Sequence, residues 1–144
     1  TDADLEELAR LEWYGGLYID NGVPCVPGEC MEATLQNAAR KRKLGKQVSA
    51  GLRCEGNFPL EYDGPKSIDE LWESEEFRYF TKVRVGTSTI MRMRPIFPKW
   101  AINIRIIFND ELLNTQDITE IVTIGGDVIG LLDRRPKFGR YHIE

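Results

Sequence analysis

An alternating run over residues 81–94 most restricts what this chain can fold into. Its even positions carry cations and its odd positions carry apolar side chains: Lys82, Arg84, Arg92 and Arg94 against Val83, Val85, Met91 and Met93. Side chains of a β-strand alternate between two faces, so an unbroken strand would have one basic face and one core face. Residues 99–108 alternate in the same way and predict the partner strand, with Pro95 to Pro98 as an irregular connection.

Helical and strand patterns elsewhere predict a single α+β domain over residues 1–144. Helices are expected at 2–14, at 29–43, from Ser67 through Trp72, and at 115–129; further strands are expected at 17–19, 24–26, 47–54, 58–62 and 138–143. The order strand, strand, helix, strand in about the last 65 residues predicts a ferredoxin-like antiparallel sheet with helices on one face. The first strand of that fold is not evident, and we expect it upstream of Thr1, missing from this chain.

Local signals predict where these elements begin, end and pack. Asp2 is expected to cap the first helix, whose apolar face would be Leu5, Leu8, Leu11 and Trp13. Asp20-Asn21-Gly22 predicts the turn of a small hairpin. Gly45 is expected to end the helix at 29–43, and Gly125-Gly126 weakens the prediction for the second half of the last helix.

Charge alternates in sign along the chain, although the net charge is only −4. Residues 40–54 and 81–108 each carry six bases and no acid, and residues 134–144 carry four bases and one acid. The segments between them are acidic. Cations gathered in this way are typical of surfaces that bind phosphates.

The basic blocks supply candidate nucleic-acid contacts. They are Lys41, Arg42, Lys43 and Lys46; Lys82, Arg84, Arg92 and Arg94; and Arg134, Arg135, Lys137 and Arg140, with Phe138 for base stacking. A structural explanation stays open for each block. The strand cations could form a solvated sheet face, those at 40–46 could offset a helix dipole, and the last block could be a basic surface loop.

Catalytic, cofactor and metal motifs are absent from the sequence. There is no Walker loop, GxGxxG or HExxH, and the one histidine, His142, has no nucleophile motif to accompany it. Cys25, Cys30 and Cys54 match neither a zinc site nor a redox pair, which favours reduced thiols in a cytoplasmic setting. No apolar run reaches 18 residues and no secretory signal is present. We therefore expect no catalytic residue, no metal, no cofactor and no membrane association.

Acidic residues at 61–76 keep one enzymatic alternative open. A metal-dependent nuclease needs two or three carboxylates that converge on a cation. Asp63 and the acids at 69–76 could do this, although acids around a capped helix are usually a solvated face.

Two short stretches resemble the RAMP superfamily, the RNA-binding proteins of CRISPR effector complexes. Residues 26–33, which begin Val26-Pro27-Gly28, are similar to its Pro-Gly helix start, and Gly130 to Tyr141 is similar to its C-terminal glycine-rich loop, with fewer glycines. The whole chain also resembles small uncharacterised proteins of phages and prophages. The landmarks are Leu17-Tyr18, Pro27-Gly28, Tyr62 to Pro65, Met91 to Pro95 and Phe138 to Arg140. The first likeness implies a ferredoxin-like fold that grips a single strand, and the second implies a phage-encoded protein of the host cytoplasm.

We expect a non-catalytic protein that binds single-stranded DNA or RNA, as a homo-oligomer along the strand. The alternative is an interaction or assembly protein, in which acidic and basic blocks pair between subunits or with a phage or host protein. The metal-dependent nuclease is the third hypothesis.

Overall fold

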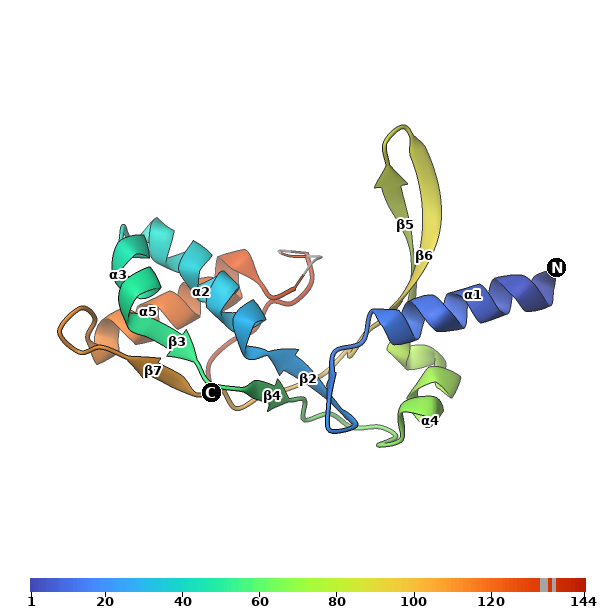
Figure 1. The fold of residues 1–144 in the computed structure, drawn as a ribbon, viewed down its shortest axis with the longest axis horizontal. Helices are drawn as coiled ribbons and strands as arrows, with labels where there is room; N and C mark the ends of the chain where they lie inside the picture. The colour runs from blue at the N-terminus through green and yellow to red at the C-terminus, as the bar shows by residue number, and fades with distance from the viewer. Residues whose placement is uncertain (133–134, 136) are drawn as a thin grey trace. The chain divides into compact units, whose positions relative to one another are not determined.

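The computed structural model describes residues 1–132, 135 and 137–144 and shows a mixed α+β fold (Figure 1). Its contacts divide the chain into two compact units. Unit 1 comprises Thr1–Cys25 and Pro59–Ile102, and unit 2 comprises Val26–Phe58 and Asn103–Glu144. The α+β class expected from the sequence is therefore confirmed, and the single domain over 1–144 stays a prediction.

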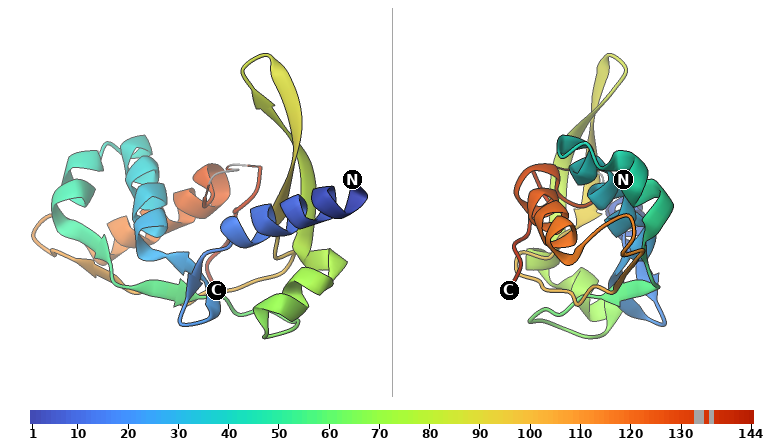
Figure 2. Two further views of the ribbon diagram at one scale, coloured as in Figure 1. Left: turned by 45° about the vertical axis from the view of Figure 1, so that its right-hand side comes forward. Right: turned by 90° about the vertical axis from the view of Figure 1, so that its left-hand side faces the viewer.

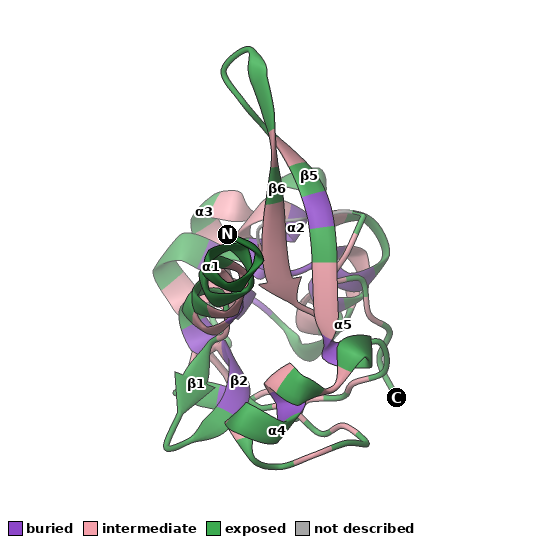
Figure 3. Cartoon of the chain, turned by 90° about the vertical axis from the view of Figure 1, so that its right-hand side faces the viewer, coloured by how far each residue is buried: buried purple, intermediate pink, exposed green. Residues whose placement is uncertain are grey.

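Unit 1 begins with helix α1, Asp2–Gly15, as the sequence predicts. Thr1, rather than the expected Asp2, is its N-cap: the Thr1 side chain accepts from the Asp4 backbone N–H, and the Asp4 carboxylate completes the capping box. Only Trp13 of the expected apolar face is buried. The other three, Leu5, Leu8 and Leu11, are exposed, so the expectation that this face packs in the core is wrong (Figure 3).

The core of unit 1 is aromatic. Trp13, Leu71 and Phe77 form a buried cluster, where Leu71 comes from α4, Ile68–Glu73, and Phe77 ends the 3-10 turn Glu75–Phe77. The Trp13 indole N–H donates to the Phe77 carbonyl at 2.8 Å, which satisfies the polar atom of this ring. Tyr62 and Phe97 stack around Phe77. This cluster fixes the last turn of α1 and leaves its first turns in solvent.

The run at 81–94 is a hairpin and not one strand (Figure 2). Strand β5, Arg78–Val85, pairs antiparallel with β6, Ser88–Pro95, across a two-residue turn in which Gly86 has a φ of 61°. A glycine in this conformation suits a tight hairpin turn. The predicted partner at 99–108 is therefore wrong, because the two halves of the run pair with each other.

A second small sheet contains β1, Ile19–Asp20, β2, Val23–Pro27, and β4, Asn57–Pro59, in the order β1-β2-β4. The expected hairpin is confirmed: β1 pairs with β2, and Asn21 and Gly22 between them have φ of 52° and 76°. Positive φ at both central residues is the signature of a type I′ turn, which Asn-Gly favours.

Unit 2 has a mostly aliphatic core between two helices. Helix α2, Gly28–Lys41, agrees with the prediction and buries Met31, Leu35 and Ala38. Helix α5, Thr115–Ile124, buries Ile121 and Val122 and continues as a π-helical turn, Gly125–Ile129. Asn114 caps α5 through a capping box with Asp117.

Three expectations for unit 2 differ from the structure: the helix end at Gly45, the strand at 47–54 and the strand at 138–143. Residues 45–51 form helix α3, Gly45–Gly51, so Gly45 begins a helix where we expected one to end, and only β3, Leu52–Cys54, remains of the strand at 47–54. The Gln36 and Ser49 side chains tie α3 to α2, a tertiary contact that local propensity does not contain. Strand β7, Ile106–Phe108, pairs with β3, and the described residues of 138–143 form no strand.

The described strands form sheets of three, two and two strands. A ferredoxin-like arrangement needs one four-stranded sheet, and it is not confirmed. Within the part of the chain that the structure describes, no helix combines the length and the apolar character needed to cross a membrane.

Candidate functional site

A glycine pair holds the C-terminal segment against α5. A Cβ on Gly126 would lie 2.2 Å from the Tyr141 carbonyl oxygen, and one on Gly125 would lie 2.5 Å from the Tyr141 hydroxyl. The hydroxyl donates to the Val122 carbonyl at 2.8 Å. Gly125 and Gly126 are therefore needed for close packing, which explains why a helix accepts two residues of low helix propensity. Burial raises the pKa of Tyr141, and the Cys54 thiol and Asp127 add to the shift.

The same contacts close the base of a basic loop. The Leu131 backbone N–H donates to the Gly139 carbonyl at 3.0 Å. Gly130 and Gly139, on either side of the loop, have φ of 77° and 80°, where a side chain is strained. From α2, the Thr34 hydroxyl donates to the Gly130 carbonyl at 2.8 Å. The loop that carries Arg135 and Lys137 is thus anchored to α2 and to the C-terminal end of α5 with its π-helical turn.

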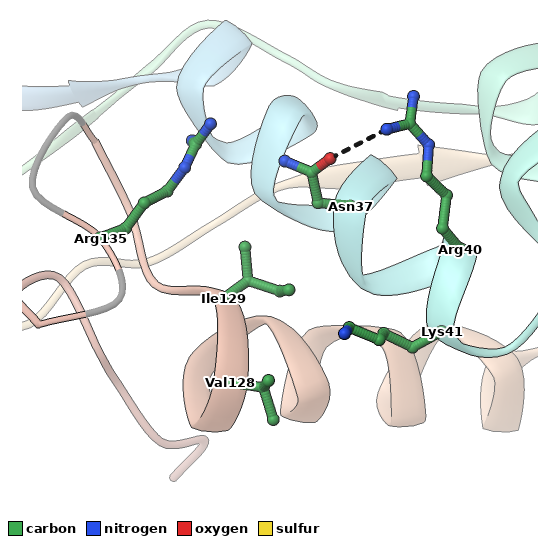
Figure 4. A pocket seen from close by; sticks show the side chains of 6 residues that line it. All are labelled: Asn37, Arg40, Lys41, Val128, Ile129 and Arg135. Carbon is green, nitrogen blue, oxygen red and sulfur yellow. Dashed lines mark hydrogen bonds between the residues drawn. The ribbon is translucent and has the colours of Figure 1, made fainter.

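A surface depression of about 610 Å³ lies between this loop and the end of α2 (Figure 4). It is lined from α2 by Asn37, Arg40 and Lys41, from the π-helical turn by Val128 and Ile129, and from the loop by Arg135. Figure 4 shows the Lys41 side chain extending from α2 toward Val128 and Ile129. Two of the three basic blocks, about 95 residues apart in sequence, therefore meet at one place.

No described carboxylate offsets the charge of the depression. Among residues 1–132, 135 and 137–144, no acid lines it and none forms an ion pair with Arg40, Lys41 or Arg135. The Arg40 guanidinium donates to the Asn37 side-chain oxygen at 3.3 Å, a neutral partner that leaves its charge intact. Val128, 50% exposed, adds an apolar surface beside the cations.

The remaining cations of the 40–46 block lie outside the depression. Arg42 forms an ion pair with Glu120 of α5. Lys43 is exposed with a φ of 59°, and Lys46 is exposed in the first turn of α3. Of the four candidates in this block, only Lys41 lines the depression.

The hairpin cations of unit 1 do not share one face, contrary to the sequence prediction. Directly paired residues of an antiparallel ladder lie on the same face. Lys82 pairs with Met91 and Arg84 with Thr89, whereas Thr81 pairs with Arg92 and Tyr79 with Arg94. Lys82 and Arg84 therefore lie on one face of the hairpin and Arg92 and Arg94 on the other, because the turn at Gly86 shifts the parity of the second strand.

Arg92 and Arg94 also share one carboxylate within unit 1, which offsets one of their two charges. One oxygen of the Glu12 carboxylate lies 3.1 Å from Nη1 of Arg92 and 3.6 Å from Nη1 of Arg94. Glu12 is itself largely covered, with 14% of its side chain exposed. These two arginines are therefore structural contacts between β6 and α1 as much as candidate ligands for phosphate.

The C-terminal block is described in part. Arg135 lines the depression and Arg140 is exposed, while Arg134 lies outside the described residues. The Lys137 amine lies 5.6 Å from the centre of the Phe138 ring, a cation–π contact that agrees with the interleaving of cations and aromatic residues in the sequence.

Sequence reasoning missed four residues of the site: Arg40, Asn37, Val128 and Ile129. Arg40 belongs to the basic block but was not among the predicted contacts. Asn37 lies one helical turn before Lys41, so its position on α2 was available from helical spacing. Val128 and Ile129 carried no signal, because their exposure depends on the π-helical turn.

The described residues contain no group of three or more His, Cys, Asp or Glu side chains that could hold a metal ion. The carboxylates at 61–76 therefore include no group of three that could hold a cation. Burial, reinforced by the nearby Glu32 carboxylate, raises the pKa of the Cys54 thiol to about 12. This thiol is therefore protonated at neutral pH and is a poor nucleophile.

Comparison with known proteins gives no relative for this chain. No model of a protein family matches it, and neither a curated protein nor a solved structure shows significant similarity.

Proposed function

We propose that this chain binds single-stranded nucleic acid, DNA or RNA, without catalysis, and that the depression of unit 2 is the contact surface. The observation that carries the proposal is the meeting of Arg40, Lys41 and Arg135 around a depression whose described lining includes no acid. Like charges repel, so three cations at one place without a carboxylate favour an anionic partner from outside the described chain.

The dipole of α2 accounts for only part of this charge. A helix C-terminus carries about half a negative elementary charge, which one cation already offsets. Arg40 and Lys41 both lie in the last turn of α2, and Arg135 belongs to no helix. About two positive charges therefore remain for a ligand, which fits two or three successive phosphates.

A single strand fits this surface better than a duplex. Unpaired bases can turn toward apolar side chains while phosphates meet the cations. Val128 and Ile129 supply the apolar contacts, and Lys137 with Phe138 lies on the same loop as Arg135. In a duplex the bases stack on each other and would leave Val128 and Ile129 without a partner.

The RAMP likeness supports RNA as the preferred ligand. Thr34 directly follows the first similar stretch, and its hydroxyl bonds Gly130, where the second stretch begins. The ferredoxin-like sheet is not required for this proposal, since the cations come from a helix end and a loop. A phage origin and a place in the host cytoplasm also remain proposals that follow from the resemblance alone.

Fluorescence anisotropy with labelled single-stranded DNA and RNA tests the proposal. The variant Lys41→Ala/Arg135→Ala is compared with Arg53→Ala/Lys99→Ala, which removes the same charge at exposed positions outside the depression. We expect the first variant alone to lose about tenfold in affinity and to reduce the slope of log K against log salt by about 1.4, since each single-strand phosphate contact contributes about 0.7.

Two results would contradict the proposal. One is the absence of binding at about 50 mM salt, where phosphate contacts are strongest. The other is an equal loss in both variants, which would assign the binding to net charge rather than to the depression.

A further inference from the structure

Helix α1 of unit 1 carries an apolar stripe that nothing in the described chain covers. Leu5, Leu8 and Leu11 are 66%, 52% and 59% exposed. Residues three apart lie on the same side of a helix, so the three leucines form one stripe. Single exposed leucines are common on protein surfaces, but three in one stripe indicate a docking face.

Acidic residues lie beside the leucine stripe on α1. Asp4 precedes Leu8 by four residues and Glu7 precedes Leu11 by four, so each carboxylate lies one turn from a leucine on the same side. Residues 1–8 are exposed all round, and a helix this short is marginal in water unless tertiary contacts stabilise it. Both observations point to a partner surface that is apolar and basic.

The hairpin of unit 1 has such a surface. On the face that holds Lys82 and Arg84, Phe80 is 57% and Met91 is 42% exposed. Lys82 and Arg84 are themselves exposed. Two large apolar side chains and two cations thus lie together on one face of the hairpin, where they complement the leucines and carboxylates of α1 in both polarity and charge.

In this structure the two surfaces do not meet within one chain, because the side chains of both are exposed. Through Glu12, α1 already contacts Arg92 and Arg94, which lie on the opposite face of the hairpin from Lys82 and Arg84. At the base of the Lys82 and Arg84 face, Met93 packs against the core cluster that contains Trp13. Phe80 and Met91 on the same face stay exposed. A second copy of the chain presents an α1 that has no such restriction.

We propose that two copies of this chain pair through unit 1, with the leucine stripe of α1 in one copy docked on the Phe80–Lys82–Arg84–Met91 face of the other. The contact is reciprocal, because each copy carries both surfaces, and a two-fold axis closes the pair without forming a filament. Apolar contacts between Leu8 and Phe80 or Met91 give the affinity, and Glu7 opposite Lys82 or Arg84 fixes the register.

Sedimentation velocity without nucleic acid tests the pairing over a range of protein concentrations. We expect a dimer in the wild type and a dissociation constant raised at least about tenfold in Leu8→Ser. Leu8 is exposed, so this substitution leaves the core of unit 1 intact. A wild type that stays monomeric at about 100 µM overturns the proposal, because a specific dimer should have a dissociation constant below this concentration.

Charge exchange gives a second and sharper test. Glu7→Lys and Lys82→Glu are each expected to weaken the dimer, and an equimolar mixture of the two variants is expected to restore it, because opposite charges then meet at both contacts. Glu6→Lys is the matched control, since it makes the same change on the other side of α1. Equal weakening by Glu6→Lys and Glu7→Lys overturns the proposal.

Nucleic acid is the competing ligand for the hairpin face. If Lys82→Glu/Arg84→Glu lowers affinity for single strands and leaves the sedimentation of the free protein unchanged, the face binds nucleic acid and self-docking is overturned. The dimer and the unit 2 depression can fail separately, because Lys41→Ala/Arg135→Ala changes none of the residues in the unit 1 contact.

Discussion

The two units of this chain use similar clusters of cations in opposite ways. In unit 1, Arg92 and Arg94 share the largely covered carboxylate of Glu12. In unit 2, Arg40, Lys41 and Arg135 line a depression that has no acid among its described residues. The blocks at 40–54 and 81–108 look equivalent in sequence, since each has six bases and no acid, yet Glu12, 80 residues before Arg92, offsets part of the charge of the second block. A basic run therefore indicates a binding surface only when no acid from elsewhere folds onto it.

The cores differ in a parallel way. Unit 1 is organised around one large ring, Trp13, with Phe77 and other aromatic side chains against it. Unit 2 distributes its burial over many smaller aliphatic side chains of α2 and α5. Unit 1 therefore depends on a single residue more than unit 2 does.

Trp13→Ala is expected to have the largest effect, a loss of about 3–5 kcal/mol in the stability of unit 1, because it leaves a cavity and removes the hydrogen bond from the indole N–H to the Phe77 carbonyl. Urea unfolding followed by circular dichroism measures the loss, and hydrogen exchange locates it. Amides of Thr1–Cys25 and Pro59–Ile102 should exchange faster, and those of unit 2 should change little. Equal acceleration in both units would show that they unfold as one.

Gly126→Ala tests the packing of unit 2 in the same way. Its Cβ would meet the Tyr141 carbonyl at 2.2 Å, so unit 2 should lose about 1–3 kcal/mol as the C-terminal segment is displaced. Single-strand binding should weaken as well, because the same segment anchors the loop of Arg135. Gly15→Ala is the control, since nothing lies within 4 Å of its Cβ and the helix gains up to about 1 kcal/mol. Unchanged binding in Gly126→Ala would separate the depression from this anchor.

Glu12→Gln tests the comparison directly, because it removes the carboxylate that pairs with Arg92 and Arg94 and leaves the cations of unit 1 without an acid, as in unit 2. Loss of the carboxylate should cost about 1 kcal/mol, since both arginines are more than a third exposed and solvent screens their charge. Affinity for single strands should rise two- to threefold, on the order of half a kcal/mol, as Arg92 and Arg94 lose their partner. The control is Glu7→Gln, whose partner Arg10 is on the same helix. An unchanged affinity would mean that these arginines are unreachable for another reason.

The reactivity of the Cys54 thiol is a probe of packing in unit 2, and it is the prediction with the smallest effect on stability. With a pKa of about 12 against an ordinary value near 9, its thiolate is scarce at pH 8.5, and alkylation should be on the order of a thousandfold slower than in urea. The raised pKa contributes stability that is fully present below pH 9 and is lost as pH rises toward 12. Mass spectrometry of the alkylated peptides follows the reaction. Rapid labelling of Cys54 in the native protein would contradict the packing described here.

The sequence predicted helices better than strand pairing. Apolar spacing placed α1, α2 and α5, because a helix is decided by neighbours within one or two turns. The prediction of one strand over 81–94 was wrong because of one residue. Gly86, in the middle of the 14-residue pattern, reverses the chain. Strands of 14 residues are also rare. The helix at Gly45–Gly51 was not predicted, because its stabilising contacts come from Gln36 of α2 and not from its own residues.

The candidate site was predicted in part for a related reason. Lys41 and Arg135 were recognised as members of basic blocks, since composition shows charge. Their meeting at one depression depends on Thr34, Gly126 and Tyr141, which carry no charge and whose contacts with one another no local pattern indicated. The ion pairs of Arg92 and Arg94 likewise required knowledge of where Glu12 lies. Position along the chain shows which charges exist, and only tertiary contacts show which are available.

The Tyr141 contact also has a consequence for the order of events on the ribosome. Arg40 and Lys41 emerge early, but the loop that faces them is anchored only when Tyr141 reaches the glycine pair. At a synthesis rate of about 5–20 residues per second, these events are separated by roughly 5–20 s. The nascent chain thus exposes a basic helix end well before it can form the depression, so a ligand of that surface is bound only after translation of this segment.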